Sequence, residues 1–116
     1  MIYIEQGTFN NIVLTLTENA TIPNPFWLFE FENEYNTESQ PIYWTMSDVS
    51  SYPERYNLFQ LIEGVDVNLI KGQYVYKVYE SADPIIIDEN TTSENLNLVE
   101  EGRMVVWGQQ LNTIYD

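Results

Sequence analysis

The chain has 116 residues, the size of one domain, and 44% of them are hydrophobic and 15% aromatic, so it can bury a core without disulfide bonds. It contains no cysteine and no histidine, which excludes disulfides, thiolate metal sites, a Ser-His catalytic triad and an ordinary zinc site. Eighteen acidic residues against four basic ones give a net charge of −14, which disfavours nucleic acid and anionic membranes as partners.

The N-terminal region predicts a broken strand followed by a loop. Residues 2–4 are apolar and extended in character, the break falls at Gln6-Gly7, and in residues 12–17 every second side chain is a large aliphatic one. Such alternation is typical of a strand with one buried face. Residues 18–25 contain two prolines and two asparagines, a composition that predicts a loop.

The most aromatic segment, residues 26–32, predicts a strand whose large rings face the core, since each such ring buries a large apolar area. Glu30 and Glu32 alternate with the rings and are expected to face solvent. A polar, turn-rich connection then leads to a further strand over residues 42–46. The expected inward side chains are Trp27, Phe29 and Phe31 from the first strand and Ile42, Trp44 and Met46 from the second.

Residues 72–80 predict the strand around which the others are organised. Tyr74 stands in the pattern Leu69-x-x-Gly72-x-Tyr74, which is typical of a tyrosine corner, in which the hydroxyl binds backbone a few residues upstream. Alternation places Tyr74, Tyr76 and Val78 on the inner face, and it places Tyr79 on the outer face.

The segment before this strand predicts another one. This strand is expected at residues 56–62, with Phe59 and Leu61 inward, and Glu63-Gly64 provides a turn into residues 65–69.

The C-terminal region predicts short pieces separated by loops. Residues 85–87 are a short apolar piece, and residues 88–95 are an acidic, polar loop. Glu101-Gly102 is expected to be a turn before a final strand at residues 103–107. Residues 108–116 are expected to form a tail.

These seven to nine short strands show no sustained helical period. The sequence therefore predicts an all-β protein, an immunoglobulin-like antiparallel β-sandwich formed as one domain by residues 1–116. A closed barrel is the second architecture.

Four segments resemble small virion proteins of crAss-like tailed bacteriophages. The resemblance covers about residues 12–107 and implies an immunoglobulin-like sandwich that decorates the capsid as an auxiliary protein or lies elsewhere in the particle. It implies no catalytic residue. The segments that carry it are Phe26-Trp27-Leu28-Phe29-Glu30-Phe31, Ser51-Tyr52-Pro53-Glu54-Arg55-Tyr56-Asn57-Leu58-Phe59, Gly72-Gln73-Tyr74-Val75-Tyr76-Lys77-Val78-Tyr79-Glu80 and Glu101-Gly102-Arg103-Met104-Val105-Val106.

Carboxylates are the only candidate catalytic side chains in the sequence. They fall in clusters such as Glu30 with Glu32 or Asp88 with Glu89. Glycoside hydrolysis needs two carboxyls across a cleft, one with a raised pKa, whereas open strand faces and loops keep carboxylates ionised. We therefore expect no enzymatic activity and no cofactor. The loop from Asp88 to Glu94 offers oxygen ligands for calcium, but its spacing is not that of an EF-hand, so a solvated loop is the favoured interpretation.

A partner is expected to contact outward aromatic side chains, which are enriched at protein interfaces. Arg55 lies beside Glu54 and near Asp48; a loop salt bridge is the favoured interpretation and a docking role the alternative. The residues expected at a partner contact are Tyr43, Tyr52, Arg55, Tyr79 and Trp107.

Two functions from different classes remain open on these residues. The first is a structural virion protein, made in the host cytoplasm, that binds the major capsid protein or another virion protein in many copies; a tail or neck position is equally compatible. The second is a carbohydrate-binding or adhesive module, because outward aromatic rings on a β-sandwich can stack on sugars. No signal peptide and no transmembrane segment is apparent in the sequence.

Overall fold

A computed structural model describes residues 1–35, 40–88 and 90–108. The predicted tail lies outside these residues apart from Gly108. The described chain contains seven strands and no α-helix, so the all-β prediction is correct. The elements are β1 (Ile2–Glu5), β2 (Phe9–Leu14), a 3-10 turn η1 (Thr17–Asn19), β3 (Phe26–Asn33), β4 (Ile42–Thr45), β5 (Asn57–Ile62), β6 (Gly72–Ser81) and β7 (Asn97–Trp107).

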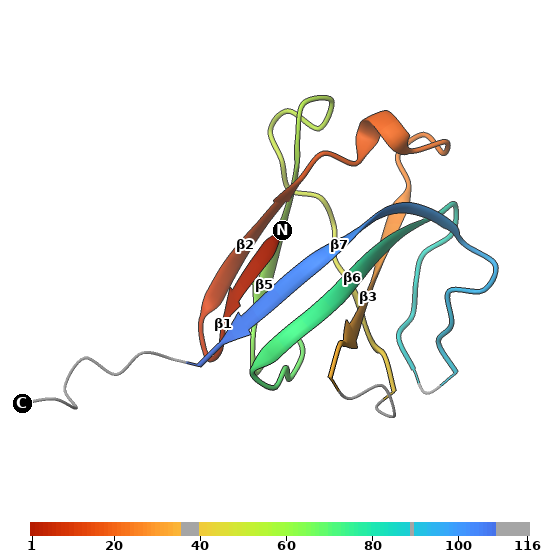
Figure 1. The fold of residues 1–116 in the computed structure, drawn as a ribbon. Coiled ribbons are helices and arrows are strands. Elements are labelled where there is room, and N and C mark those ends of the chain that lie inside the picture. The colour runs from red at the N-terminus through yellow and green to blue at the C-terminus, as the bar shows by residue number, and fades with distance from the viewer. Residues whose placement is uncertain (36–39, 89, 109–116) are drawn as a thin grey trace, which may run out of the picture.

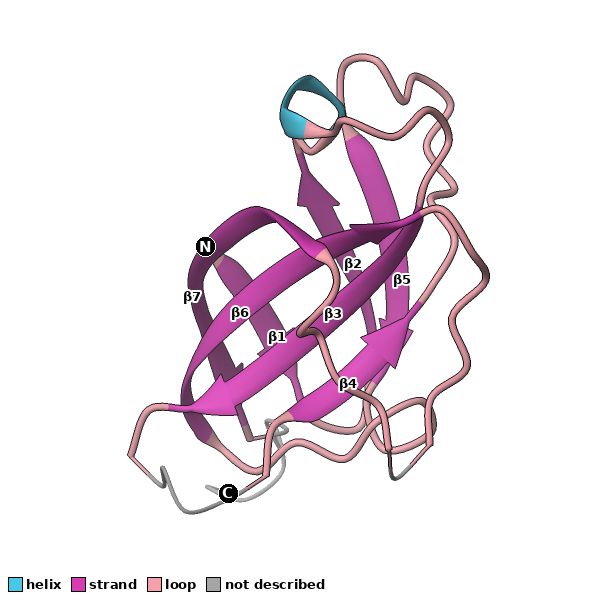
Figure 2. Ribbon diagram, turned by 90° about the vertical axis from the view of Figure 1, so that its right-hand side faces the viewer, coloured by secondary structure: helices cyan, strands magenta, loops and turns pink. Residues whose placement is uncertain are grey.

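The strands form two sheets (Figure 1). The five-stranded sheet has the order β1-β7-β6-β3-β4, and the two-stranded sheet pairs β2 with β5, which lie behind it in Figure 2. Neighbouring strands are antiparallel except β1 and β7, which run parallel. The fully antiparallel prediction is wrong at this pair, because β1 and β7 are joined by no hairpin that would fix their relative direction.

The core lies between the two sheets and contains the inward side chains that alternation predicts. Trp27, Phe29 and Phe31 of β3 are buried, and the ring of Phe29 meets Phe59 of β5 edge-on at a centroid distance of 4.8 Å. Trp44 packs against Phe29 from β4 at 4.9 Å. Aromatic contacts therefore join the five-stranded sheet to the two-stranded sheet.

No helix in the described chain is long and apolar enough to span a bilayer.

Tyr74 makes the contact that its sequence pattern predicts. Its buried ring carries a hydroxyl that donates to the Ile70 carbonyl oxygen at 2.9 Å. Gly72 has a φ of +146°, a backbone conformation that favours glycine, and Leu69 packs in the core. The Tyr74 side chain thus holds the backbone of the loop before β6 against the sandwich.

The predicted turn at Glu101-Gly102 is wrong, because both residues lie inside the single long strand β7. Gly102 is paired with Tyr76 of β6. A Cβ added at Gly102 would lie 2.7 Å from the Tyr76 hydroxyl oxygen, so this glycine makes room for an aromatic ring and does not end the strand. The apolar piece at residues 85–87 also forms no strand.

Candidate binding surfaces

The outer face of the five-stranded sheet is covered where a binding platform was expected. Tyr79 points outward but is only 9% exposed, and its neighbour Leu28 on β3 is buried as well. The connection from β6 to β7, which the structure describes at residues 82–88 and 90–96, crosses in front of β3 and β4 (Figure 2). The prediction that Tyr79 is available for contact is therefore wrong, because alternation gives the side of a sheet and not whether a loop covers that side.

Glu30 lies under the same cover, contrary to the expectation that it faces solvent. It is buried, its Oε1 accepts a hydrogen bond from the Ser93 hydroxyl at 3.2 Å, and its Oε2 lies 4.0 Å from Lys77 Nζ. Tyr43 is half-buried beside it. Burial raises the pKa of Tyr43, and the hydrogen bond with Glu30 raises it further. Tyr43 therefore belongs to the covered region and not to an open aromatic platform.

The other three predicted contact residues are exposed but lie apart. Tyr52 and Arg55 occupy the loop between β4 and β5, whereas Trp107 ends β7. Within the described chain, Arg55 forms no ion pair with Glu54 or Asp48. The loop salt bridge is therefore not formed, since the Asp48 carboxylate accepts hydrogen bonds from backbone and from Asn57.

Trp107 has an exposed aromatic partner that the sequence pattern did not single out. Tyr3 on β1 meets Trp107 edge-on, with ring centroids 5.9 Å apart and an interplanar angle of 84°. The parallel pairing of β1 with β7 brings the two rings together. Because this pairing joins the two ends of the sequence, no local pattern could have revealed it.

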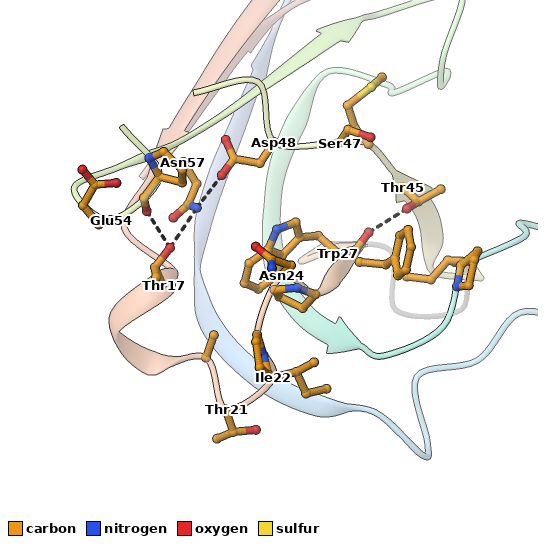
Figure 3. A pocket seen from close by; sticks show the side chains of 18 residues that line it. Thr17, Thr21, Ile22, Asn24, Trp27, Thr45, Ser47, Asp48, Glu54 and Asn57 are labelled. Atoms are coloured by element: carbon orange, nitrogen blue, oxygen red, sulfur yellow. Dashed lines mark hydrogen bonds between the residues drawn. The ribbon is translucent and has the colours of Figure 1, made fainter. Parts of the chain in front are cut away.

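A groove of about 940 Å³ opens at one end of the molecule (Figure 3). The walls come from three loops, at residues 20–26, 46–54 and 84–85, and the buried Trp27 lies in it. Prolines and aliphatic side chains make most of the lining apolar. Asp48 and Glu54 are the ionisable residues among those that line it.

A buried hydrogen-bond network supports this groove. The Asn57 side chain is buried; it accepts a bond from the Leu16 backbone and donates to Asp48 Oδ2 at 2.7 Å and to the Thr17 hydroxyl at 3.2 Å (Figure 3). The Thr17 hydroxyl in turn donates to the Pro53 carbonyl oxygen. These bonds satisfy the Asn57 side chain and give the Asp48 carboxylate a structural role. Among the described residues that line the groove, Glu54 is then the one carboxyl not held in this network, so they provide no pair of free carboxyls for acid–base chemistry.

Glu80 is a buried carboxylate that the sequence analysis overlooked. It is 1% exposed, and it accepts hydrogen bonds from the Thr21 and Ile22 backbone, the Thr21 hydroxyl and the Asn97 amide. Burial acts to raise its pKa, but these bonds outweigh burial and lower the pKa. A glutamate in register with the inward Tyr74, Tyr76 and Val78 was the signal that could have identified it.

The described residues of the acidic loop form local hydrogen bonds. Asp88 Oδ1 accepts the Asn90 backbone N–H at 2.8 Å. Within residues 1–35, 40–88 and 90–108, no group of three acidic side chains is arranged to hold a metal ion. A calcium site is therefore not proposed from these residues.

Comparisons with known proteins found no homologue of this chain. The chain matches no protein-family model, no curated protein and no solved structure. The chemistry of a partner is consequently inferred from the side chains that the molecule exposes and from its charge of −14.

Proposed function

We propose that this chain is a non-enzymatic structural protein of a tailed-phage virion, an auxiliary protein of immunoglobulin-like fold that binds the major capsid protein in many copies. The observation that carries the proposal is that a strongly acidic molecule leaves large apolar side chains exposed on both of its sheets. These side chains include Tyr3, Phe9, Val13 and Trp107. Exposed apolar side chains of this kind mark protein contacts. The four segments that resemble crAss-like virion proteins support the same conclusion.

The strand arrangement supports the immunoglobulin-like assignment. The first strand pairs with the last in one sheet, the second pairs with the fifth in the other, and a corner tyrosine lies on the sixth. In immunoglobulin domains such a tyrosine lies near the start of the penultimate strand, which is the position of Tyr74 in β6.

The state of the buried carboxylates supports a non-enzymatic role. Glu63 accepts the backbone N–H groups of Gly7 and Leu69 at 2.7 and 2.9 Å. Glu80 accepts four donors, and its pKa is lowered, the opposite of what a general acid requires at neutral pH. Both carboxylates join loops to strands.

The direct test is binding to shells that lack the protein. Purified protein should co-sediment with such shells, saturate at many copies per shell, and bind less tightly as salt rises if its acids face a basic partner. Failure to bind, or labelling confined to the tail or neck of virions, would contradict the capsid position. Salt-insensitive attachment would indicate apolar contacts instead.

A carbohydrate-binding module is the second candidate, and the exposed Tyr3–Trp107 pair favours it. The two rings meet at 84°, so only one of them can lie flat against a sugar ring. Retention on a polysaccharide column, lost in Trp107→Ala and kept in the control Tyr35→Ala, would support this function over capsid binding. Tyr35 is a suitable control because it is also an exposed aromatic residue.

A further inference from the structure

The outer face of the two-stranded sheet is uncharged in a protein of net charge −14. Its apolar side chains are exposed: Phe9 by 53%, Val13 by 60% and Ile62 by 38%. The opposite faces of β2 and β5 carry the buried Ile12, Leu14, Phe59 and Leu61. The outward side chains form three cross-strand pairs: Phe9 with Ile62, Asn11 with Gln60, and Val13 with Leu58.

The outer edge of β5 is blocked at both of its ends by local hydrogen bonds. Leu58 N–H donates to Asp48 Oδ1 at 3.0 Å, and Leu58 C=O accepts the Val49 N–H at 2.9 Å. At the other end of the strand, Ile62 N–H donates to Asp66 Oδ2, and Ile62 C=O accepts the Asp66 N–H, both at 2.8 Å. Strand addition along β5 is therefore blocked at Leu58 and Ile62, which favours a partner that contacts the side chains of this face.

The same bonds place negative charge on the border of the face. Asp48 and Asp66 lie along the β5 edge, beside Leu58 and Ile62. A complementary surface has an apolar centre and basic side chains at its border. A second copy of this chain is a poor fit, since it would bring another −14 of charge and the same acidic border.

We propose that the outer face of the two-stranded sheet is the docking surface for a protein partner whose apolar patch is bordered by lysine or arginine. The inference rests on the proposed function, under which this partner is the major capsid protein of the shell. The Tyr3–Trp107 region is a weaker fit, because the outer face of its sheet also carries charged side chains, among them Glu5 and Arg103.

The test is co-sedimentation of full-length variants with shells that lack the protein. Val13→Glu should reduce binding at least tenfold, with an unchanged melting temperature because Val13 is exposed. Phe9→Glu should act in the same way. The matched control is Ile86→Glu, which makes the same change in charge at a position that is 82% exposed in the connection between β6 and β7, and it should bind as the wild type does.

The outcomes separate the inference from the proposed function. If the wild type binds shells and Val13→Glu binds equally well, or better through its added charge, the docking surface is overturned and the proposed function stands. If the wild type does not bind shells, the proposed function and this partner are both overturned. Sedimentation equilibrium gives the remaining outcome: a wild-type dimer that Val13→Glu dissociates would assign the face to a second copy and contradict the partner proposed above.

Discussion

The two outer faces of the sandwich differ in what covers them. On the five-stranded sheet, Leu28, Glu30 and Tyr79 are buried, and Ser93 of the connection between β6 and β7 donates a hydrogen bond to Glu30. On the two-stranded sheet, Phe9 and Val13 remain exposed, and the face carries no charged side chain. The outward Tyr79 therefore has a structural role on one sheet, whereas the outward Phe9 and Val13 are available to a partner on the other.

The largest contrast should appear when one side chain from each face is truncated. Tyr79→Ala should lower the free energy of unfolding by about 2–4 kcal/mol, because it leaves a cavity under the covering connection. Val13→Ala should lower it by less than about 1 kcal/mol, the effect of strand propensity at an exposed site. Urea denaturation of both variants measures the difference. Equal losses would show that the two faces are not differently covered.

Removal of Glu80 tests how the covering connection is held at its end. Glu80→Ala should cost about 2–3 kcal/mol, because Thr21, Ile22 and Asn97 would lose their hydrogen bonds to a buried, charged acceptor. The control is Glu94→Ala. Glu94 lies in the connection between β6 and β7 and is exposed, so its removal should change the free energy of unfolding by less than about 0.5 kcal/mol. Chemical denaturation followed by tryptophan fluorescence measures both, and a Glu80 variant as stable as the Glu94 variant would refute the anchoring role.

Removal of the corner tyrosine's hydroxyl should lower the stability of the protein and leave binding at both outer faces unchanged. Tyr74→Phe removes the hydroxyl that donates to Ile70 and should cost about 1–2 kcal/mol. Thermal unfolding measures the loss, and co-sedimentation with shells should be unchanged below the melting temperature. An unaltered melting temperature would contradict the assignment of Tyr74 as a corner tyrosine.

The smallest effect expected is a pH dependence that belongs to Glu80. Its pKa is lowered in the folded protein from an ordinary value of 4.5, so its contribution to stability is present above about pH 4.5 and is lost as pH falls through the folded pKa. Glu80→Gln should remove this component from the stability profile between pH 7 and pH 2.5. Profiles of identical shape for the wild type and the variant would contradict the lowered pKa.

The strand pattern of the sequence was sufficient for the inner half of the molecule. Alternation places Phe29 on β3 and Phe59 on β5 toward the core, where their rings meet, and the pattern around Gly72 predicts the bond from Tyr74 to Ile70. These predictions depend on residues close in the sequence, which strand geometry relates directly to one another.

The errors concern contacts between distant segments, which the sequence pattern missed. Tyr79 is covered by a connection that has no periodicity, so nothing local indicates the cover. Gly102 was interpreted as a strand breaker, although it makes room for the ring of Tyr76. The Tyr3–Trp107 pair depends on a parallel pairing of the first and last strands. Each of these errors concerns tertiary context that overrides a local rule.

The most direct test of the central claim is a cryo-electron microscopy reconstruction of virions that contain the protein. The proposed docking predicts many copies of the sandwich on the shell, with Phe9 and Val13 of the two-stranded sheet against the major capsid protein and residues 82–96 turned away. Copies attached through the five-stranded sheet would contradict the docking surface. Copies found only at the tail or neck, or absent from the particle, would contradict the capsid function itself.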